Sequence, residues 1–369
     1  MKKILILTWT PFYKWDYKRY GLDELDKTFE IIIFDISKIL FDTISINKIY
    51  KKYDKIKTHK FYKKKALIER LKNKNFDLVI NLTGLNSSND IYKEILKKKI
   101  KIVTIIDHKL GSQIFFPKKI FIILRYICKK IWSYFYKKIK YEFFIIGADN
   151  IYNKIRSVGV EKIYSHSINY DLSLRDSKKN KTKKKKIVAY IDSGYGLHPD
   201  FKLTTGFNKK FDLKNYSKKI NFLFYTLKKM NYEIYFLSHP KIENHKQKIY
   251  KNCKIVYYKT HEYIKNSDLV IFSGSSVLDY AIMYKKKILR IFSSEVKSYP
   301  ICNKADNDFY KFFKYSSLNL DKLDTESQIL DKIMLPNEKY KKYGNMFIKH
   351  PKSKNVQYSK LIQRIINFK

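Results

Sequence analysis

Strand-length apolar runs alternate with Lys-rich helical stretches along the whole chain. The runs are nearly continuous, whereas a strand with one face in solvent alternates apolar and polar residues. In the first half the runs are Ile4–Thr8, Glu30–Phe34, Leu78–Leu82, Ile102–Ile106 and Phe143–Ile146, and the helical stretches between them are Lys60–Asn73 and Asp90–Lys99. This pattern predicts an α/β fold in which helices cover both faces of a parallel sheet.

A cationic break divides the pattern into two series. Residues 177–186, SKKNKTKKKK, contain no apolar side chain and are expected to form a linker. Beyond it the predicted strands are Ile187–Asp192, Glu233–Leu237, Lys254–Tyr258, Leu269–Phe272 and Ile288–Phe292, separated by helices at Asn215–Met230, His261–Lys265 and Val277–Tyr284. Two series predict two facing, Rossmann-like doubly wound domains, residues 1–176 and 187–369. A final helix, Ser359–Phe368, could pack back on the first domain.

The charge of the chain is strongly positive, at +44 from 78 basic and 34 acidic residues. Only seven of the basic residues are Arg, the residue that sequence-specific nucleic-acid readers favour, so no nucleic-acid partner is expected. The Lys excess accompanies abundant Ile, Asn, Tyr and Phe, all residues with AT-rich codons. Codon bias and solvation therefore explain much of the charge, and an anionic membrane is the alternative explanation.

The cysteines and the apolar runs indicate a cytoplasmic protein. Cys128, Cys253 and Cys302 lie far apart, which argues against a disulfide framework and against structural zinc. The N-terminal apolar run is short and lacks a small-residue cleavage site, so a buried first strand is expected there instead of a signal peptide. No stretch reaches the roughly 18 uncharged apolar residues of a spanning helix.

Small, polar and glycine residues follow three of the predicted strands in the second half. They are Asp192–Asp200, which includes Gly194 and His198, then Ser238-His239-Pro240, and then Ser273-Gly274-Ser275-Ser276 before a helix. In open α/β sheets ligands bind outside the carboxyl ends of the strands, so these segments are expected to meet in one crevice. A Ser-rich helix start can bind phosphate through its backbone N–H groups.

Each of these segments also has a purely structural interpretation. Ser275 or Ser276 could cap the helix that follows. His239-Pro240 could be a turn that ends a strand, and Asp192 could bond to the backbone in an Asx-turn. The coincidence of all three segments at successive strand ends favours the ligand site.

The span from Tyr232 to Phe292 resembles the donor-binding half of GT-B glycosyltransferases. The resemblance is carried by YEIYFLSHP and by HEYIKNSDLVIFSGSSVLDYAIMYKKKILRI, and more loosely by Phe143–Asp149 in the first half. The His-Pro pair and the Ser-rich loop are most similar to those of bacterial enzymes that use CMP-activated sugars. The resemblance implies that His239, Ser275 and Ser276 contact the donor, and that Asp279 holds a ribose or sugar hydroxyl.

The resemblance also implies which groups perform the transfer. An inverting reaction needs a base for the acceptor hydroxyl, and Asp192 is the first candidate, with His198 as its assistant or replacement. Asp107 and His108 are candidates on the acceptor side. GT-B enzymes generally do without a metal and no DxD follows a strand, so neither metal nor cofactor is expected. The first loop, Trp9-Thr10-Pro11-Phe12, lacks a glycine-rich segment, so the first domain is expected to receive the acceptor.

Residues 118–140, KKIFIILRYICKKIWSYFYKKIK, predict a basic amphipathic helix with interfacial aromatic residues. Such a helix can lie in an anionic membrane surface, pack on the sheet as an ordinary helix, or bind a partner protein.

Taken together, these features predict a glycosyltransferase that adds a sugar from a nucleotide donor, CMP-sugar before UDP-sugar, to a bacterial lipooligosaccharide or capsule at the inner membrane. The alternatives are a nucleotide-sugar 2-epimerase, a polyol-phosphate transferase and a noncatalytic nucleic-acid binder.

Overall fold

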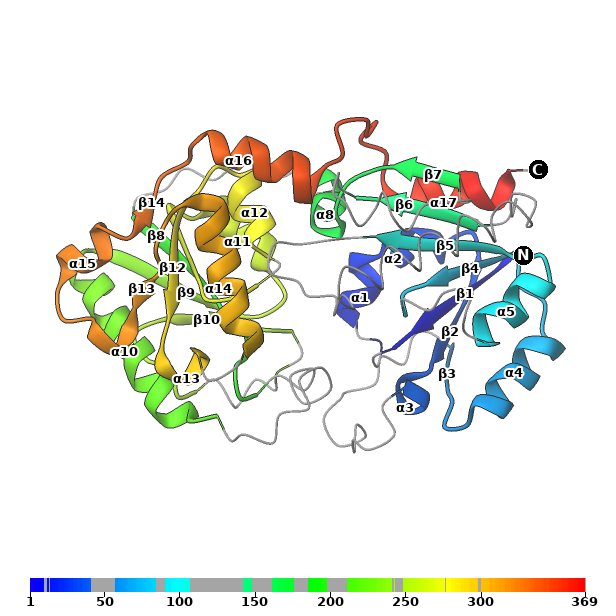
Figure 1. Cartoon of the computed structure of the whole chain (residues 1–369), viewed down its shortest axis with the longest axis horizontal. Coiled ribbons are helices and arrows are strands. Elements are labelled where there is room, and N and C mark those ends of the chain that lie inside the picture. The colour runs from blue at the N-terminus through cyan, green and yellow to red at the C-terminus, as the bar shows by residue number, and fades with distance from the viewer. Residues whose placement is uncertain are drawn as a thin grey trace, which may run out of the picture. The chain divides into compact units, whose positions relative to one another are not determined.

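The computed structural model describes residues 1–9, 12, 14–40, 57–83, 90–106, 142–147, 161–175, 185–197, 211–240, 242, 248–275, 277–297 and 300–368. These residues form two compact units (Figure 1). The first contains the described residues up to Arg175 and those from Asn345 onward. The second contains those from Lys185 to Gly344.

The sheet of the first unit is entirely parallel. Its strands are β1 (Lys3–Thr8), β2 (Glu30–Asp35), β3 (Lys57–Lys60), β4 (Leu78–Asn81), β5 (Lys101–Ile106), β6 (Glu142–Ile146) and β7 (Glu161–Tyr164). Their order is β3-β2-β1-β4-β5-β6-β7. All five predicted runs are confirmed as strands. The two strands that were not predicted, β3 and β7, lie at the edges, where partly exposed Lys-containing segments carry no apolar run.

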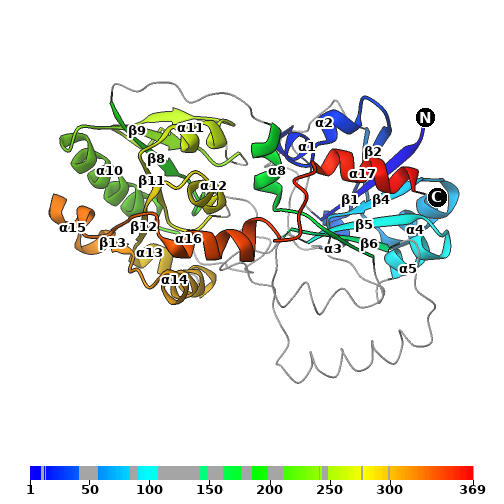
Figure 2. The same cartoon turned by 90° about the horizontal axis from the view of Figure 1, so that it is seen from above.

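Helices cover both faces of this first sheet. They are α1 (Lys14–Arg19), α2 (Leu22–Leu25), α3 (Ser37–Leu40), α4 (Lys64–Asn73), α5 (Asp90–Lys97), α8 (Ile168–Arg175) and α17 (Tyr358–Asn367). α4 and α5 pack on one face through Leu67, Leu71 and Ile95. α2 and α17 pack on the other face with Ile4, Ile6 and Ile80, as Figure 2 shows for α17 in red.

α17 and the chain leading to it are joined to the first unit by a buried polar network. The Asp171 carboxylate accepts a hydrogen bond from the Tyr358 backbone N–H at 2.7 Å and lies 3.1 Å from His166 Nε2. Arg175 forms an ion pair with the same carboxylate at 3.2 Å. Ser359 donates to Glu24 of α2. The final helix therefore completes the core of the first unit.

The sheet of the second unit has the same kind of strand order. Its strands are β8 (Lys186–Ile191), β9 (Tyr232–Leu237), β10 (Lys254–Val256), β11 (Leu269–Phe272), β12 (Lys287–Phe292), β13 (Leu318–Asn319) and β14 (Ile333–Met334). The order is β10-β9-β8-β11-β12-β13, with β14 antiparallel to β12 and the other pairs parallel. All five predicted strands of this half are confirmed, and both sheets have the order of a Rossmann-like fold.

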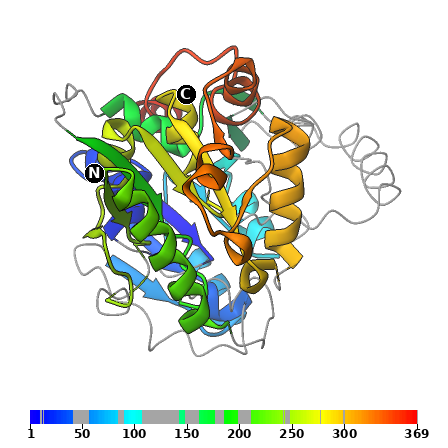
Figure 3. The same cartoon turned by 90° about the vertical axis from the view of Figure 1, so that its left-hand side faces the viewer.

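The helices of the second unit also lie on both faces of its sheet (Figure 3). They are α10 (Leu213–Lys229), α11 (Thr260–Asn266), α12 (Leu278–Met283), α13 (Ser294–Lys297), α14 (Pro300–Phe313), α15 (Glu326–Leu330) and α16 (Glu338–Tyr343), with a 3-10 turn η3 (Leu320–Lys322). A π-helical turn, Gly344–Ile348, starts at the last residue of this unit and continues into the first unit. α10 packs through Ile220 and Leu227 on the face that carries Ile271. Phe309 of α14 meets Phe272, whose side chain points to the opposite face.

Two sequence predictions lie largely outside this description. The predicted amphipathic helix at residues 118–140 is not among the described residues, and neither are residues 177–184 of the linker predicted at 177–186. The last residue of that predicted linker, Lys186, is the first residue of β8. Of the helices that are described, none combines the length and the apolar character needed to cross a bilayer.

Candidate functional site

The candidate site lies where the strand order of the second sheet reverses direction. β8 is flanked by β9 on one side and by β11 on the other. The chain adds β9 and β10 on one side of β8 and then crosses over to add β11, β12 and β13 on the other side. At such a switch point the loops diverge and leave room for a ligand outside the carboxyl ends of the strands. The loops that follow β8, β9 and β11 are the three segments that the sequence selected.

Asp192, directly after β8, holds two of these loops together. Its Oδ1 accepts the Gly194 N–H at 2.8 Å, which is the Asx-turn considered above, and its Oδ2 accepts the His239 N–H at 3.4 Å. The residue is 7% exposed. Both carboxylate oxygens therefore receive backbone N–H groups, from the β8 loop and from the β9 loop.

Ser193 joins the β8 loop to the loop after β11. Its hydroxyl donates to the Gly274 carbonyl at 2.8 Å and accepts the Gly274 N–H at 3.3 Å. This two-way bond fixes the backbone of Gly274 beside the switch point. Ser193 belongs to the predicted segment Asp192–Asp200, but no role was predicted for it.

Two glycines of the β8 loop have a backbone that other residues adopt only with strain. Gly194 and Gly196 have φ values of 70° and 73°. A Cβ at Gly196 would also lie 2.7 Å from Cδ1 of Phe211. The glycine requirement in this loop is therefore conformational.

Tyr195 lies below the loops and ties them to the core. Ser273, at the end of β11, donates to the Tyr195 hydroxyl at 2.8 Å. Burial raises the pKa of Tyr195, and burial also raises the pKa of the neighbouring Cys302 thiol to about 11. Both groups are therefore neutral at physiological pH, and Tyr195 serves as a hydrogen-bonding support for Ser273.

Arg290 of β12 is buried under the same region. It lies between the rings of Phe272 and Phe309, at 5.9 and 5.0 Å, and its Nε lies 3.4 Å from Asp306. Burial lowers the pKa of this guanidinium. Arg290 thus attaches α14 to the sheet.

The His-Pro pair lies at the end of β9, next to β8. His239 and Pro240 are both half-buried, and the His239 carbonyl accepts the Ile242 N–H at 3.0 Å in a turn. The structural alternative for this pair, a turn that ends the strand, is thus observed. The backbone N–H of His239 donates to Asp192, so the turn after β9 lies beside the β8 loop.

The Ser-rich loop has one observed structural role. Ser275 accepts the Val277 N–H at 3.2 Å in a turn just before α12. The N-cap residue of α12 is Val277, which has no side-chain cap, so Ser275 does not cap this helix. Ser276 lies outside the described residues, as does His198.

The predicted role of Asp279 does not fit its surroundings. Asp279 lies in α12, is fully buried, and accepts a hydrogen bond from the Tyr343 hydroxyl of α16 at 3.2 Å. A ribose hydroxyl has no access to a carboxylate enclosed in this way. Asp279 links two helices, because α16 returns to cover α12 from a distant part of the chain.

The first unit has its own switch point, between β1 and β4. There Asn81 Oδ1 accepts the Thr83 N–H at 3.1 Å, in a turn resembling that of Asp192. The acceptor-side candidates Asp107 and His108 follow β5 directly and lie outside the described residues.

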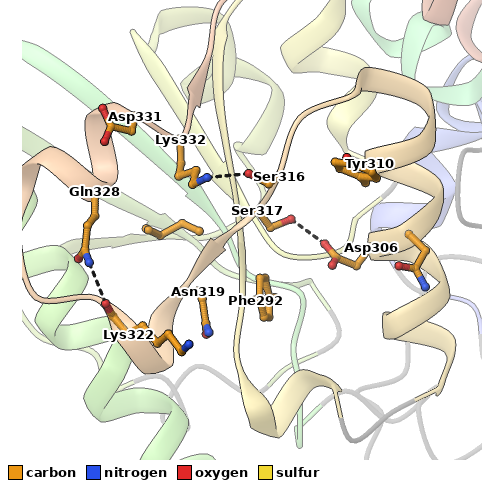
Figure 4. A pocket seen from close by; sticks show the side chains of 12 residues that line it. Phe292, Asp306, Tyr310, Ser316, Ser317, Asn319, Lys322, Gln328, Asp331 and Lys332 are labelled. Carbon is orange, nitrogen blue, oxygen red and sulfur yellow. Dashed lines mark hydrogen bonds between the residues drawn. The ribbon is translucent and has the colours of Figure 1, made fainter.

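A pocket of about 500 Å³ lies at the β12–β13 side of the second sheet (Figure 4). Its polar groups largely bond one another: Ser317 donates to Asp306 at 2.6 Å, Lys332 to Ser316 at 2.7 Å, and Gln328 to the Lys322 carbonyl at 3.1 Å. No residue that the sequence selected lines it. In the described part of the chain, no three His, Cys, Asp or Glu side chains are grouped as a metal site would require.

No protein-family model matches the chain, and no curated protein sequence matches it. Solved structures do match it. The S. aureus MnaA–UDP co-structure aligns with a TM-score of 0.50 at 11% identity, over 100% of this chain and 97% of that one. A putative UDP-N-acetylglucosamine 2-epimerase from Listeria monocytogenes aligns with a TM-score of 0.51 at 10% identity, over 100% and 96%. At these identities the likeness is one of fold, and it confirms the predicted GT-B class of two Rossmann-like α/β domains.

Proposed function

We propose that this protein is a GT-B enzyme that binds a nucleotide-activated sugar at the switch point of its second sheet and transfers the sugar to a glycan acceptor. The observation that carries the proposal is the two-way hydrogen bond between Ser193 and Gly274. It joins the loops of the two strands between which the strand order reverses, which is where doubly wound folds bind nucleotides.

The residues at this edge have the chemistry that a nucleotide diphosphate or monophosphate requires. Gly194 and Gly274 allow a ligand to approach the backbone closely, and His239 and Pro240 border the same edge. In this proposal His239, Ser275 and Ser276 contact the donor phosphate or nucleotide, while Ser273 supports the loop from below. Sugar transfer also needs a general base, for which Asp192 and His198 stay the candidates.

We expect that Asp192 contributes to the reaction mainly by holding the β8 and β9 loops in position. Its carboxylate receives N–H groups from two loops, so the same atoms that would remove a proton also hold the site together. The variant Asp192→Asn keeps the size but replaces one acceptor oxygen by an NH₂ donor, which faces a backbone N–H.

The sequence motifs and the aligned structure favour different nucleotides for the donor. The His-Pro and Ser-rich motifs favour a CMP-sugar, whereas the aligned S. aureus structure holds UDP. We retain CMP as the first expectation and UDP as the second. The acceptor is expected to be a lipid-linked or surface glycan such as lipooligosaccharide or capsule. Docking of residues 118–140 on the inner membrane would bring the enzyme to such an acceptor in the cytoplasm.

A nucleotide-sugar 2-epimerase is the second candidate, because one of the aligned structures carries that description. An epimerase needs no acceptor. Conversion of a UDP-sugar to its 2-epimer by the purified protein alone would therefore identify it, and release of free nucleotide only when a glycan acceptor is added identifies a transferase.

The first test is a thermal-shift screen of the purified chain against CMP, UDP, GDP and their sugars. A ligand that binds the folded state raises Tm with the logarithm of its saturation, by about 2.7 kcal/mol of stability at a hundredfold excess over Kd. One nucleotide is expected to raise Tm, and His239→Ala to abolish the rise. A chain that responds to no nucleotide would contradict the proposal.

Asp192→Asn then separates positioning from base catalysis. If Asp192 positions the loops, the variant loses the nucleotide-induced Tm rise and activity together, and the protein loses about 1–2 kcal/mol of stability. If Asp192 is the base, nucleotide binding persists while turnover falls by roughly 10²–10⁴. Asp324→Asn, the same change at an exposed residue of the second unit, is the matched control and should alter neither nucleotide binding nor turnover.

A further inference from the structure

The outer side of α10 carries exposed aromatic side chains among lysines. Phe222 and Tyr225 are 43% and 48% exposed, and Ile249, on a neighbouring segment, is 38% exposed. The opposite side of the helix is fixed in the core of the second unit through Tyr216, Ile220 and Phe224. The exposed aromatic residues are therefore held outward by a rigid element.

The lysines of α10 lie on the same stripe as these aromatic residues. At 3.6 residues per turn, Lys214, Lys218, Phe222, Tyr225 and Lys229 fall within an arc of about 80°. All five are exposed. The Lys229 ammonium lies 4.6 Å from the centroid of the Tyr225 ring. The stripe thus has two aromatic side chains at its centre and lysines at both ends.

The segment 248–254 widens this stripe into a surface. Asn221 of α10 donates to the Ile249 carbonyl at 2.9 Å and accepts the Lys251 N–H at 2.7 Å, which fixes the segment beside the helix. Lys248 and Lys251 are both exposed. We call the group Lys214, Lys218, Phe222, Tyr225, Lys228, Lys229, Lys248, Ile249 and Lys251 the α10 surface.

The charge of the α10 surface has one sign. Neither Leu213–Lys229 nor residues 248–254 contain an Asp or a Glu, and the α10 surface has Lys at positions 214, 218, 228, 229, 248 and 251. The other two lysines of these segments are outside this surface and form ion pairs with neighbouring elements, Lys219 with Glu295 and Asp321, and Lys254 with Glu233. A uniform cationic surface with apolar side chains at its centre is complementary to a surface that presents negative charge over an apolar layer.

We propose that the α10 surface docks on an anionic lipid bilayer. Phe222 and Ile249 would enter the boundary between headgroups and acyl chains, and Tyr225 would remain at headgroup level with its hydroxyl hydrated. The surrounding lysines would bind lipid phosphates as mobile point charges, with their aliphatic stems along the apolar boundary. The inference is independent of residues 118–140 and of the nucleotide site.

Single-stranded nucleic acid is the alternative ligand for such a surface, because it combines negative phosphates with bases that stack on aromatic rings. The absence of Arg from α10 and from residues 248–254 favours lipid, because Arg is the residue that stacks on bases and binds phosphates in a bidentate manner.

The test is sedimentation of the full chain with vesicles of phosphatidylcholine alone and of phosphatidylcholine with phosphatidylglycerol. Wild type is expected to sediment with the anionic vesicles only, and less so as salt rises. Phe222→Ser/Tyr225→Ser should weaken this binding at least tenfold. Lys214→Gln/Lys218→Gln/Lys229→Gln should weaken it on the order of 100-fold, at roughly fivefold per lysine.

Matched controls come from exposed positions elsewhere. Tyr62→Ser/Tyr310→Ser removes two aromatic rings that are 59% and 54% exposed, and Lys311→Gln/Lys341→Gln/Lys342→Gln removes three exposed lysines. Both control variants should bind like wild type, and circular dichroism checks that all variants fold. The proposal is overturned if the α10 variants bind anionic vesicles like wild type, if the control variants lose as much, or if the α10 variants instead lose binding to single-stranded DNA while no vesicle binding exists.

Discussion

At the scale of single residues, positions 192–196 after β8 show how backbone geometry and backbone hydrogen bonds determine which residue type fits. Gly194 and Gly196 are required by positive φ, and Asp192 and Ser193 are required by the backbone groups they bind. These four positions therefore have little freedom to change shape. For the nucleotide proposed above, such preorganisation would reduce the entropy that binding must offset.

Replacement of Gly196 by Ala should destabilise the second unit. The left-handed backbone disfavours a Cβ, and that Cβ would lie 2.7 Å from Phe211. We expect the free energy of unfolding to fall by about 1–3 kcal/mol in urea denaturation. Gly344→Ala is the control, because a Cβ at Gly344 meets nothing within 4 Å and its backbone is helical. An equal loss in both variants would contradict the conformational explanation.

At the scale of elements, α17 is the clearest case of an amphipathic helix that completes a distant core. Leu361, Ile362, Ile365 and Ile366 are buried against residues of β1 and β4, while Lys360 and Arg364 are not buried. The apolar positions recur at helical spacing, so the helix is encoded locally. Its partner is determined by the network of Asp171, His166 and Tyr358.

Truncation of the Ile362 side chain should therefore destabilise the first unit specifically. Ile362→Ala removes a fully buried side chain and should cost about 2–5 kcal/mol. Hydrogen exchange is expected to accelerate in β1, β4 and β5 but not in β8 to β12. Leu330→Ala, at a residue that is 55% exposed in the second unit, should leave both units unchanged. Faster exchange confined to the second unit would show that α17 supports the other core.

At the scale of the whole molecule, the net charge of +44 is the dominant electrostatic property. Like charges repel in the folded state, where they are closer together than in the extended chain. Salt shortens the range of this repulsion, from about 30 Å at 0.01 M to about 10 Å at 0.1 M.

Moderate salt should accordingly stabilise the protein. We expect Tm to rise by several degrees between 10 and 100 mM NaCl, measured by differential scanning calorimetry. Tetramethylammonium chloride at the same ionic strength should have the same effect, since screening does not depend on the cation. A Tm that stays constant or falls would mean that the positive charges are already compensated in the folded state.

Most strands and the location of the candidate site were predictable because local sequence patterns identify them. The elements and roles that were predicted wrongly or missed depend on contacts with distant parts of the chain or are too short to show a pattern. Ten apolar runs are continuous enough to identify strands, and the residues after β8, β9 and β11 follow from the rule on strand ends. By contrast, the edge strands β3 and β7 carry no apolar run, and β13 and β14 are only two residues long. Asp279 was expected in the site, yet Tyr343, sixty-four positions away, encloses it.

The amino-acid sequence by itself determined the parallel α/β class and the elements with continuous apolar runs, because burial on both faces of a sheet requires apolar residues at successive positions. Only the tertiary structure decided which strand lies beside which, and therefore that Ser193 meets Gly274 and that α17 completes the first core. Those pairings depend on contacts between segments far apart in the chain, and local patterns carry no information about their partners.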